Sequence, residues 1–343
     1  MKPNHRVKEP AIPCHPPVYF CMRAQGKPEK IDGNLQKDFW KPGTWINEFQ
    51  DIEGPSRLKP WKWTKVKVLW DEEALYIGAL LQDDTIWATV LSRDEVIFTD
   101  NDFEVFLAPQ ESSHRYYELE MNAANAVWDL YMEKPQRDGV HRIIGWDIHG
   151  LESAVKIDGR LNDPSAENRS WSLELKIPWF SLRECGEDQC YPSHFAPNPG
   201  ETWRMNFSRV EYDVEIRDSH YRKVCDLESG KPMPEHNWVW APTGVIDIHM
   251  PEMWGYLIFS DHGEVYPAPE ENPAKLLLRR LYYREHAYSC REGKFTEDTL
   301  LLLGEGAGRC GLRVYTTPSM FEGIAEDQGQ RWHIRQDGYL WME

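Results

Sequence analysis

The sequence lacks the patterns that mark several common protein classes. No run of 18 apolar residues is present to span a membrane, and residues 1–17 contain no apolar core of the kind an export signal needs. The seven cysteines include no Cys-x-x-Cys pair, which argues against a zinc ribbon or a disulfide scaffold and favours reduced thiols. A Cys185–Cys190 bridge would fit only an external protein. We therefore expect a chain that is cytoplasmic as written, and secreted or periplasmic if a leader precedes it.

Positive charge and cofactor motifs are also scarce. The 39 Lys and Arg residues stand against 56 Asp and Glu residues, and the net charge of −17 repels phosphate backbones and anionic lipid. We expect neither a nucleic acid nor a membrane as partner. The sequence has no P-loop, Gly-x-Ser-x-Gly or His-Glu-x-x-His motif. It therefore predicts no nucleotide cofactor and supports no serine-hydrolase or zinc-protease chemistry.

Aromatic residues, by contrast, are abundant, and the chain is tryptophan-rich, with 16 Trp. Flat rings stack on the apolar faces of sugar rings, while carboxylates and amides bond the sugar hydroxyls. Trp128, Trp240 and Trp254 lie near predicted loops, where a ring can be exposed. Core packing is the alternative for each of them, and the sequence leaves that choice open.

Short alternating segments separated by turn residues predict a mainly β protein with an antiparallel β-sandwich. Within residues 116–122, Tyr117, Leu119 and Met121 would face the core. The same alternation places a set of polar side chains together on the opposite face of the sheet: Glu104, Glu118, Glu120, Asn122, Asn206 and Ser208. The sequence therefore predicts a sheet surface lined by carboxylates and amides.

Changes of composition divide the chain into four parts. Residues 1–29 are proline-rich and predict an extended lead-in with one strand at 18–22, and residues 30–260 carry the strand pattern. Residues 261–272 resemble a linker, and 273–343 predict a helix followed by a small β-meander. We expect a sandwich with a small α+β C-terminal extension.

Acidic residues suggest two further kinds of site. Oxygen-rich turns and strand ends could hold calcium, although the pattern of an EF-hand is absent and solvated turn acids are the alternative. The candidate ligands are Asp71, Asp84, Asp100 and Asp102. Glu104, Glu118 and Glu120 could also act as the paired carboxylates of a glycoside hydrolase. The sequence gives no separation between these carboxylates, so hydrolysis stays an alternative to binding.

Eight short segments, in this order, resemble the carbohydrate-binding module family 9. They are Ile31-Asp32-Gly33 with Phe39-Trp40, Val68-Leu69-Trp70-Asp71, Asn101-Asp102-Phe103-Glu104, Tyr117-Glu118-Leu119-Glu120, Trp171-Ser172-Leu173-Glu174 with Ile177-Pro178-Trp179, Trp203-Arg204-Met205-Asn206, Trp238-Val239-Trp240 and Pro251-Glu252-Met253-Trp254. Together they extend over residues 30–260.

The resemblance implies a jelly-roll-like sandwich that binds a sugar between two aromatic rings and holds structural calcium. By position, the first ring falls at Phe98, where characterised modules have Trp, and the polar contacts fall near Glu104, Glu120, Asn122, Asn206 and Ser208. Ile248 stands where the second ring belongs, so His249 or Trp254 would have to replace it. Glu120 stands where the family has a basic residue.

We therefore expect non-catalytic binding of an oligosaccharide or polysaccharide, linked to carbohydrate catabolism, with glycoside hydrolases acting on the same glycan as partners. A glycoside hydrolase or an accessory to one is the first alternative. The second is a haem-binding electron-transfer domain of the related DOMON type, because His249 and Met250 supply the two kinds of axial ligand.

Overall fold

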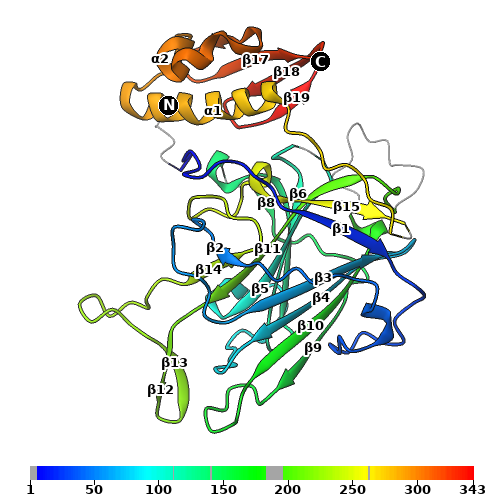
Figure 1. Ribbon diagram of the computed structural model, residues 1–343. Coiled ribbons are helices and arrows are strands. Elements are labelled where there is room, and N and C mark those ends of the chain that lie inside the picture. Colours follow the sequence, from blue (N-terminus) through cyan, green and yellow to red (C-terminus); the bar gives the residue numbers. More distant parts are fainter. Residues whose placement is uncertain (1–5, 111, 140, 183–195, 262) are drawn as a thin grey trace.

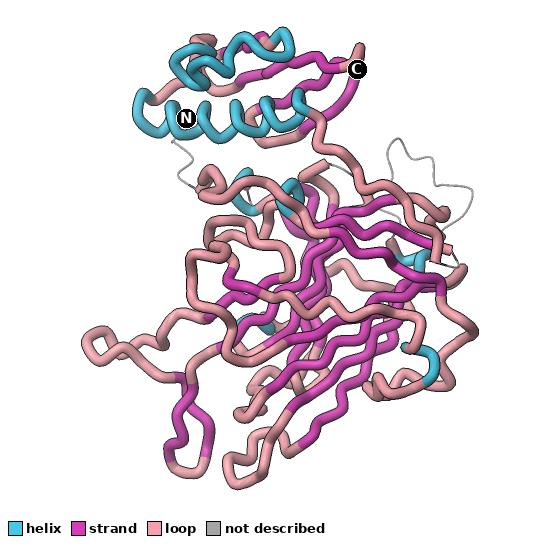
Figure 2. Tube along the Cα trace, in the orientation of Figure 1, coloured by secondary structure: helices cyan, strands magenta, loops and turns pink. Residues whose placement is uncertain are grey.

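The computed structural model describes residues 6–110, 112–139, 141–182, 196–261 and 263–343, and the Cys185–Cys190 pair considered above lies outside them. A mainly β body carries a small extension at one side, and the α-helices of the described residues lie in the extension (Figures 1 and 2). The fold class predicted from the sequence is confirmed.

One curled sheet makes up the body, and within the described residues it has 13 strands. Eleven of them follow each other across the sheet in this order: β8 (His141–Ile143), β7 (Val127–Lys134), β6 (Tyr116–Asn122), β5 (Asp102–Ala108), β11 (Thr202–Glu211), β15 (Gly255–Ser260), β1 (Val18–Arg23), β3 (Thr64–Trp70), β4 (Ala74–Gln82), β10 (Ser170–Pro178) and β9 (Glu152–Asp158). β14 (His236–Val239) joins β11 to β2 (Gln50–Asp51), and β12 (Val214–Arg217) and β13 (His220–Lys223) form a separate hairpin.

The sheet curls so that its two halves face each other across a shared apolar core (Figure 1). Val68, Ile77 and Leu173 come from one half, and Leu119 and Phe207 come from the other. The predicted inward positions of β6 are among these core residues. Alternation along the strands therefore predicts the core side correctly, because successive side chains of a strand point to opposite faces.

The N-terminal lead-in contributes more to the sheet than its sequence indicates. β1 pairs in parallel with both β15 and β3, and so it lies inside the sheet and joins its two halves. A segment expected as an extended lead-in ahead of the sandwich is therefore part of it. These parallel pairs are an exception to the antiparallel pairing expected throughout.

The extension consists of helix α1 (Pro273–Glu292), helix α2 (Thr299–Leu303) and the strands β16 (Arg313–Thr316), β17 (Phe321–Asp327), β18 (Gln330–Arg335) and β19 (Leu340–Met342). Asn272 caps α1 by accepting hydrogen bonds from the N–H groups of Ala274 and Lys275. Leu278 and Leu281 pack on Gly323 of β17. Neither helix has the length and apolarity that a membrane-spanning segment requires, in the part of the chain that the structure describes.

Candidate functional site

Four of the predicted polar and aromatic residues form one row across the sheet. Ser208 lies opposite Glu104, Glu104 opposite Glu120, and Glu120 opposite Trp128, on strands β11, β5, β6 and β7. Asp102 and Glu118 lie one step to either side on the same face. Carboxylate oxygens of Asp102, Glu104 and Glu120 all lie within 4.8 Å of one another. We refer to Asp102, Glu104, Glu118 and Glu120 as the acidic cluster.

Burial changes the protonation of the acidic cluster, because a charged carboxylate loses its hydration there. It raises the pKa of Glu104 to about 7, with the charge of Glu235 adding to the shift. It raises the pKa of Glu118 to about 8, and the charge of Glu104 contributes. The pKa values of Asp102 and Glu120 rise for the same reasons. At neutral pH the cluster is therefore partly protonated and offers hydrogen-bond donors as well as acceptors.

Phe98 is the predicted ring that remains open to solvent. It lies in the 3-10 turn η2 (Ile97–Thr99), and 43% of the residue is exposed. Its ring centroid is 6.3 Å from that of Trp128, which lies beneath it and is 2% exposed. The N–H of Phe98 donates to Oε2 of Glu120 at 2.9 Å, and its carbonyl accepts from the hydroxyl of Tyr212 at 3.0 Å. Both backbone polar groups of Phe98 are thus bonded, which fixes the backbone of the turn that carries the ring.

Two predicted rings and two predicted amides are structural. Trp240 packs in the sandwich core, and Trp254 is fully buried with its indole N–H on the carbonyl of Ile248 at 2.8 Å. Asn122 and Asn206 are also fully buried. The side-chain amide of each donates a hydrogen bond to a backbone carbonyl and accepts one from a backbone N–H group. Their place in the fold leaves these four residues no free face or hydrogen-bonding group for a ligand, so we leave them out of the candidate site.

The position of the second ring is occupied by an aliphatic side chain. Ile248 packs against an apolar cluster that contains Ile97 and Trp128. His249 is half-buried, its Nδ1 lies 2.9 Å from the hydroxyl of Tyr116, and burial lowers its pKa to about 4. The neighbouring Met250 packs in a different cluster, beneath the extension. His249 and Met250 therefore do not converge as a haem ligand pair, and the site has one open ring.

Three residues near Phe98 were not found from the sequence. Arg142 of β8 lies 5.6 Å above the ring of Trp128, and its charge opposes in part the burial that raises the pKa of Glu118. Lys223 of β13 contacts the carbonyl of Thr99 and lies 3.4 Å above the ring of Tyr212. Glu235 raises the pKa values of Glu104 and Tyr212. These charges come from hairpins and loops whose sequence has no periodic pattern, so the sequence offers no signal for them.

The four predicted calcium ligands do not form one site. The carboxylate of Asp71 accepts from two backbone N–H groups and the hydroxyl of Tyr76, and that of Asp100 accepts from the N–H groups of Thr89 and Val90. Asp71 precedes β4 and Asp84 follows it, so the two residues lie at opposite ends of this strand. The carboxylate of Asp84 lies 3.1 Å from Nζ of Lys62. Asp102 belongs to the acidic cluster. Protein donors already occupy most of these oxygens, so the expected set does not fit a calcium ion.

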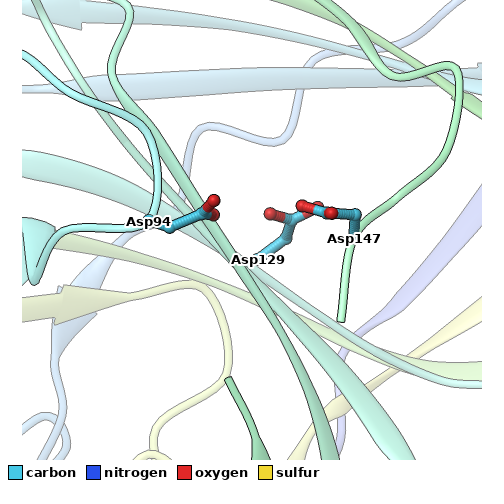
Figure 3. A group of neighbouring side chains, drawn as sticks. All are labelled: Asp94, Asp129 and Asp147. Atoms are coloured by element: carbon cyan, nitrogen blue, oxygen red, sulfur yellow. The ribbon is translucent and has the colours of Figure 1, made fainter. Parts of the chain in front are cut away.

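A second group of acids comes closer to the geometry of a cation site. Asp94, Asp129 and Asp147 point toward one another (Figure 3), and their oxygens lie within 4.8 Å. Nη2 of Arg93 lies 2.6 Å from Asp129 and 3.0 Å from Asp147. The guanidinium group of Arg93 therefore supplies the positive charge that these acids need.

Three solved structures are similar to this chain. A candidate carbohydrate-binding protein from Bacteroides uniformis ATCC 8492 superposes with a TM-score of 0.50 at 14% identity, over 72% of this chain and 100% of that one. A carbohydrate binding module family 9 from Caldicellulosiruptor kristjanssonii, in complex with cellotriose, gives a TM-score of 0.44 at 14% identity over 74% of this chain and 100% of that one. The same organism's module in complex with glucose gives 0.42 at 15% identity over 72% and 98%.

No curated protein sequence matches the chain. A family model does: the one described as carbohydrate family 9 binding domain-like matches residues 31–189, a segment that contains Phe98, Trp128 and the whole acidic cluster. Residues 31–189 of this chain are therefore similar to the carbohydrate family 9 binding domain-like family.

Proposed function

We propose that the sandwich binds carbohydrate without catalysis, with the ring of Phe98 as the surface on which a sugar stacks. The observation that carries the proposal is the 43% exposed ring of Phe98, on a hydrogen-bonded turn beside Trp128 and the acidic cluster. The proposal is also supported by the match of residues 31–189 to the carbohydrate family 9 binding domain-like model.

The residues around Phe98 match the chemistry of a sugar. The apolar face of a sugar ring lies flat on an aromatic face, and the hydroxyls at its edge need both donors and acceptors. Arg142 and Lys223 supply donors, and the exposed Glu235 supplies acceptors. With one ring in place of two, we expect affinities between millimolar and micromolar, about −4 to −8 kcal/mol, because a sugar exchanges water bonds for similar protein bonds.

Glucose and cellotriose are the first ligands to test, because the structures of the two Caldicellulosiruptor complexes contain them. A role in carbohydrate catabolism, in which this protein holds a glycan on which a glycoside hydrolase acts, is our proposal for the wider function.

The test compares the full chain with Phe98→Ala by isothermal titration with glucose and cellotriose, and on an array of neutral oligosaccharides. Phe180→Ala is the matched control, since Phe180 is 45% exposed and lies outside the site. We expect Phe98→Ala to weaken binding at least tenfold and Phe180→Ala to leave it unchanged. Equal binding by both variants, or no binding by the unaltered chain, would overturn the proposal. Release of shortened sugars that Glu104→Gln abolishes would favour a hydrolase instead.

A further inference from the structure

We propose that a second cleft, beside Trp61, is a separate binding site for a sugar ring. The proposal takes its ligand class from the proposed function, but it rests on a different surface of the molecule. The cleft has a volume of about 440 Å³, and the residues that line it include Trp61, Lys62, Gln82, Asp84, Arg169 and Tyr212.

Trp61 has the properties of a stacking platform. It is 52% exposed, which is unusual for a side chain of this size. Its ring packs at nearly right angles to the rings of Trp238 and His236, with centroids 4.6 Å away in both cases. These two contacts hold the indole in one orientation, so little side-chain entropy would be lost when a ligand covers its open surface.

The charges inside the cleft are balanced without a ligand. Lys62 is buried, and its Nζ lies 2.7 Å from both Asp83 and Glu211. Arg209 is also buried and pairs with Glu211 at 2.7 Å. Because these charges satisfy one another, the floor of the cleft does not require an ionic ligand.

The rim supplies polar groups that a ligand can reach. Asp84 has 78% of its side chain exposed and Arg169 has 59%. Asp84 lies 3.1 Å from Nζ of Lys62. The ion pairs of Arg169 with Glu167 and Asp158 lie at the surface and contribute little free energy. The carboxylate is an acceptor, the guanidinium is a donor, and the amide of Gln82 is both. A fixed ring edged by such groups suits a neutral sugar better than an apolar peptide or an ion.

Tyr212 separates this cleft from the first site. It lines the cleft, while its hydroxyl donates to the carbonyl of Phe98. The two sites are therefore neighbours that share one structural residue but have different stacking rings, and a substitution of Trp61 or Phe98 can remove one site at a time.

The experiment measures the full chain, Phe98→Ala, Trp61→Ala, Asp84→Ala and the double variant Phe98→Ala/Trp61→Ala on an array of neutral oligosaccharides that includes cellotriose. Trp63→Ala is the control, since Trp63 is 42% exposed and does not line the cleft. Asp84→Ala guards against a folding defect of Trp61→Ala, because Asp84 is a surface residue. Thermal unfolding of each variant checks its fold.

We expect Phe98→Ala to keep part of the array signal of the unaltered chain. In the double variant this remaining signal should fall at least tenfold. Asp84→Ala should weaken the array signal of the unaltered chain, and Trp63→Ala should leave it unchanged. A blank array for Phe98→Ala would overturn the second site and leave the proposed function standing. Unaltered binding by Phe98→Ala that Trp61→Ala removes would support the second site and overturn the role of Phe98. No signal from the unaltered chain would overturn both.

Discussion

The backbone N–H of Phe98 donates a hydrogen bond of 2.9 Å to Oε2 of Glu120. Glu120 stands where the resemblance to family 9 modules would place a basic, sugar-contacting residue, yet it is 2% exposed and bonds the turn that carries the ring. Basic groups come instead from Arg142 on the edge strand β8 and from Lys223 on β13. A change of charge at one position is thus accompanied by a change of role, from contacting a ligand to positioning a ring.

The first prediction concerns this positioning role. Glu120→Ala removes the acceptor for the N–H of Phe98 and should weaken sugar binding about tenfold, the equivalent of about 1.4 kcal/mol. Glu120→Gln keeps an acceptor oxygen and should bind almost normally. Isothermal titration with cellotriose measures both variants. Equal affinities for Ala and Gln would show that the bond does not position the ring.

The second prediction is a loss of stability with rising pH. The pKa of Glu118 is raised to about 8 in the folded chain, mainly by burial, whereas an unfolded chain has an ordinary value near 4.3. Between these values the folded state binds more protons than the unfolded state, so the free energy of unfolding falls as pH rises. From pH 6.5 to 8.5 we expect Glu118 to account for about 2 kcal/mol of that fall. This window lies above the titration of His249, whose lowered pKa acts in the opposite direction.

Urea unfolding of the unaltered chain and of Glu118→Gln over this pH range tests the prediction. The neutral amide cannot ionise, so the variant should lose less stability than the unaltered chain as pH rises. Glu95→Gln, at an exposed position, is the control and should behave like the unaltered chain. Parallel curves for Glu118→Gln and the unaltered chain would contradict the raised pKa.

The sandwich could be predicted from the sequence because alternation along strands such as β6 states directly which side chains share a face. The outward set of Glu104, Glu118 and Glu120 follows from the same rule. The sequence could not predict that other residues cover this face. Ile97 and Trp254 pack over it, and both come from loops without periodicity. The exposure of Phe98 likewise depends on hydrogen bonds to Glu120 and Tyr212, which are distant in the sequence and cannot be predicted from a local pattern.

A third prediction tests the structural role of Trp240. A Cβ added at Gly255 would lie 2.5 Å from the indole of Trp240 and 3.0 Å from the carbonyl oxygen of Pro17. Gly255→Ala should therefore destabilise the fold by about 2 kcal/mol or more, as expected when a packed core is overfilled. Gly26→Ala is a poor control because Gly26 has a positive φ, whereas Gly308→Ala meets no neighbour and should be nearly neutral. Thermal unfolding with equal midpoints for the Gly255 and Gly308 variants would contradict the core position of Trp240.

The fourth prediction concerns Arg93 and calcium. Arg93→Ala leaves the buried Asp129 without its cation, and we expect a loss of roughly 2 kcal/mol in the free energy of unfolding. Calcium chloride should raise the unfolding temperature of this variant, because Asp94, Asp129 and Asp147 then offer oxygens to a hard cation. The unaltered chain should respond weakly to calcium or chelator. A marked fall of its unfolding temperature with chelator would instead show that it holds the structural calcium that family resemblance implies.

The last prediction concerns the attachment of the extension. Arg137 is 2% exposed, and its Nη2 lies 2.6 Å from Oε1 of Glu252. The hydroxyl of Tyr283, from helix α1, donates to the same carboxylate, and that of Tyr282 donates to Asp138 at 2.6 Å. Glu252 thus joins the sandwich to the extension through two buried partners.

Glu252→Ala takes the charge partner from a buried guanidinium, so we expect it to cost about 3 kcal/mol or more, with the effect concentrated where α1 meets the sandwich. Limited proteolysis within residues 261–272 should then become faster, because a loosened extension allows that segment to open. Glu343→Ala, at a side chain that is 62% exposed, is the control and should be cleaved at the normal rate. If Glu252→Ala lowers the unfolding temperature without faster cleavage of the segment, the network stabilises the sandwich alone, and the apolar packing of α1 holds the extension in place.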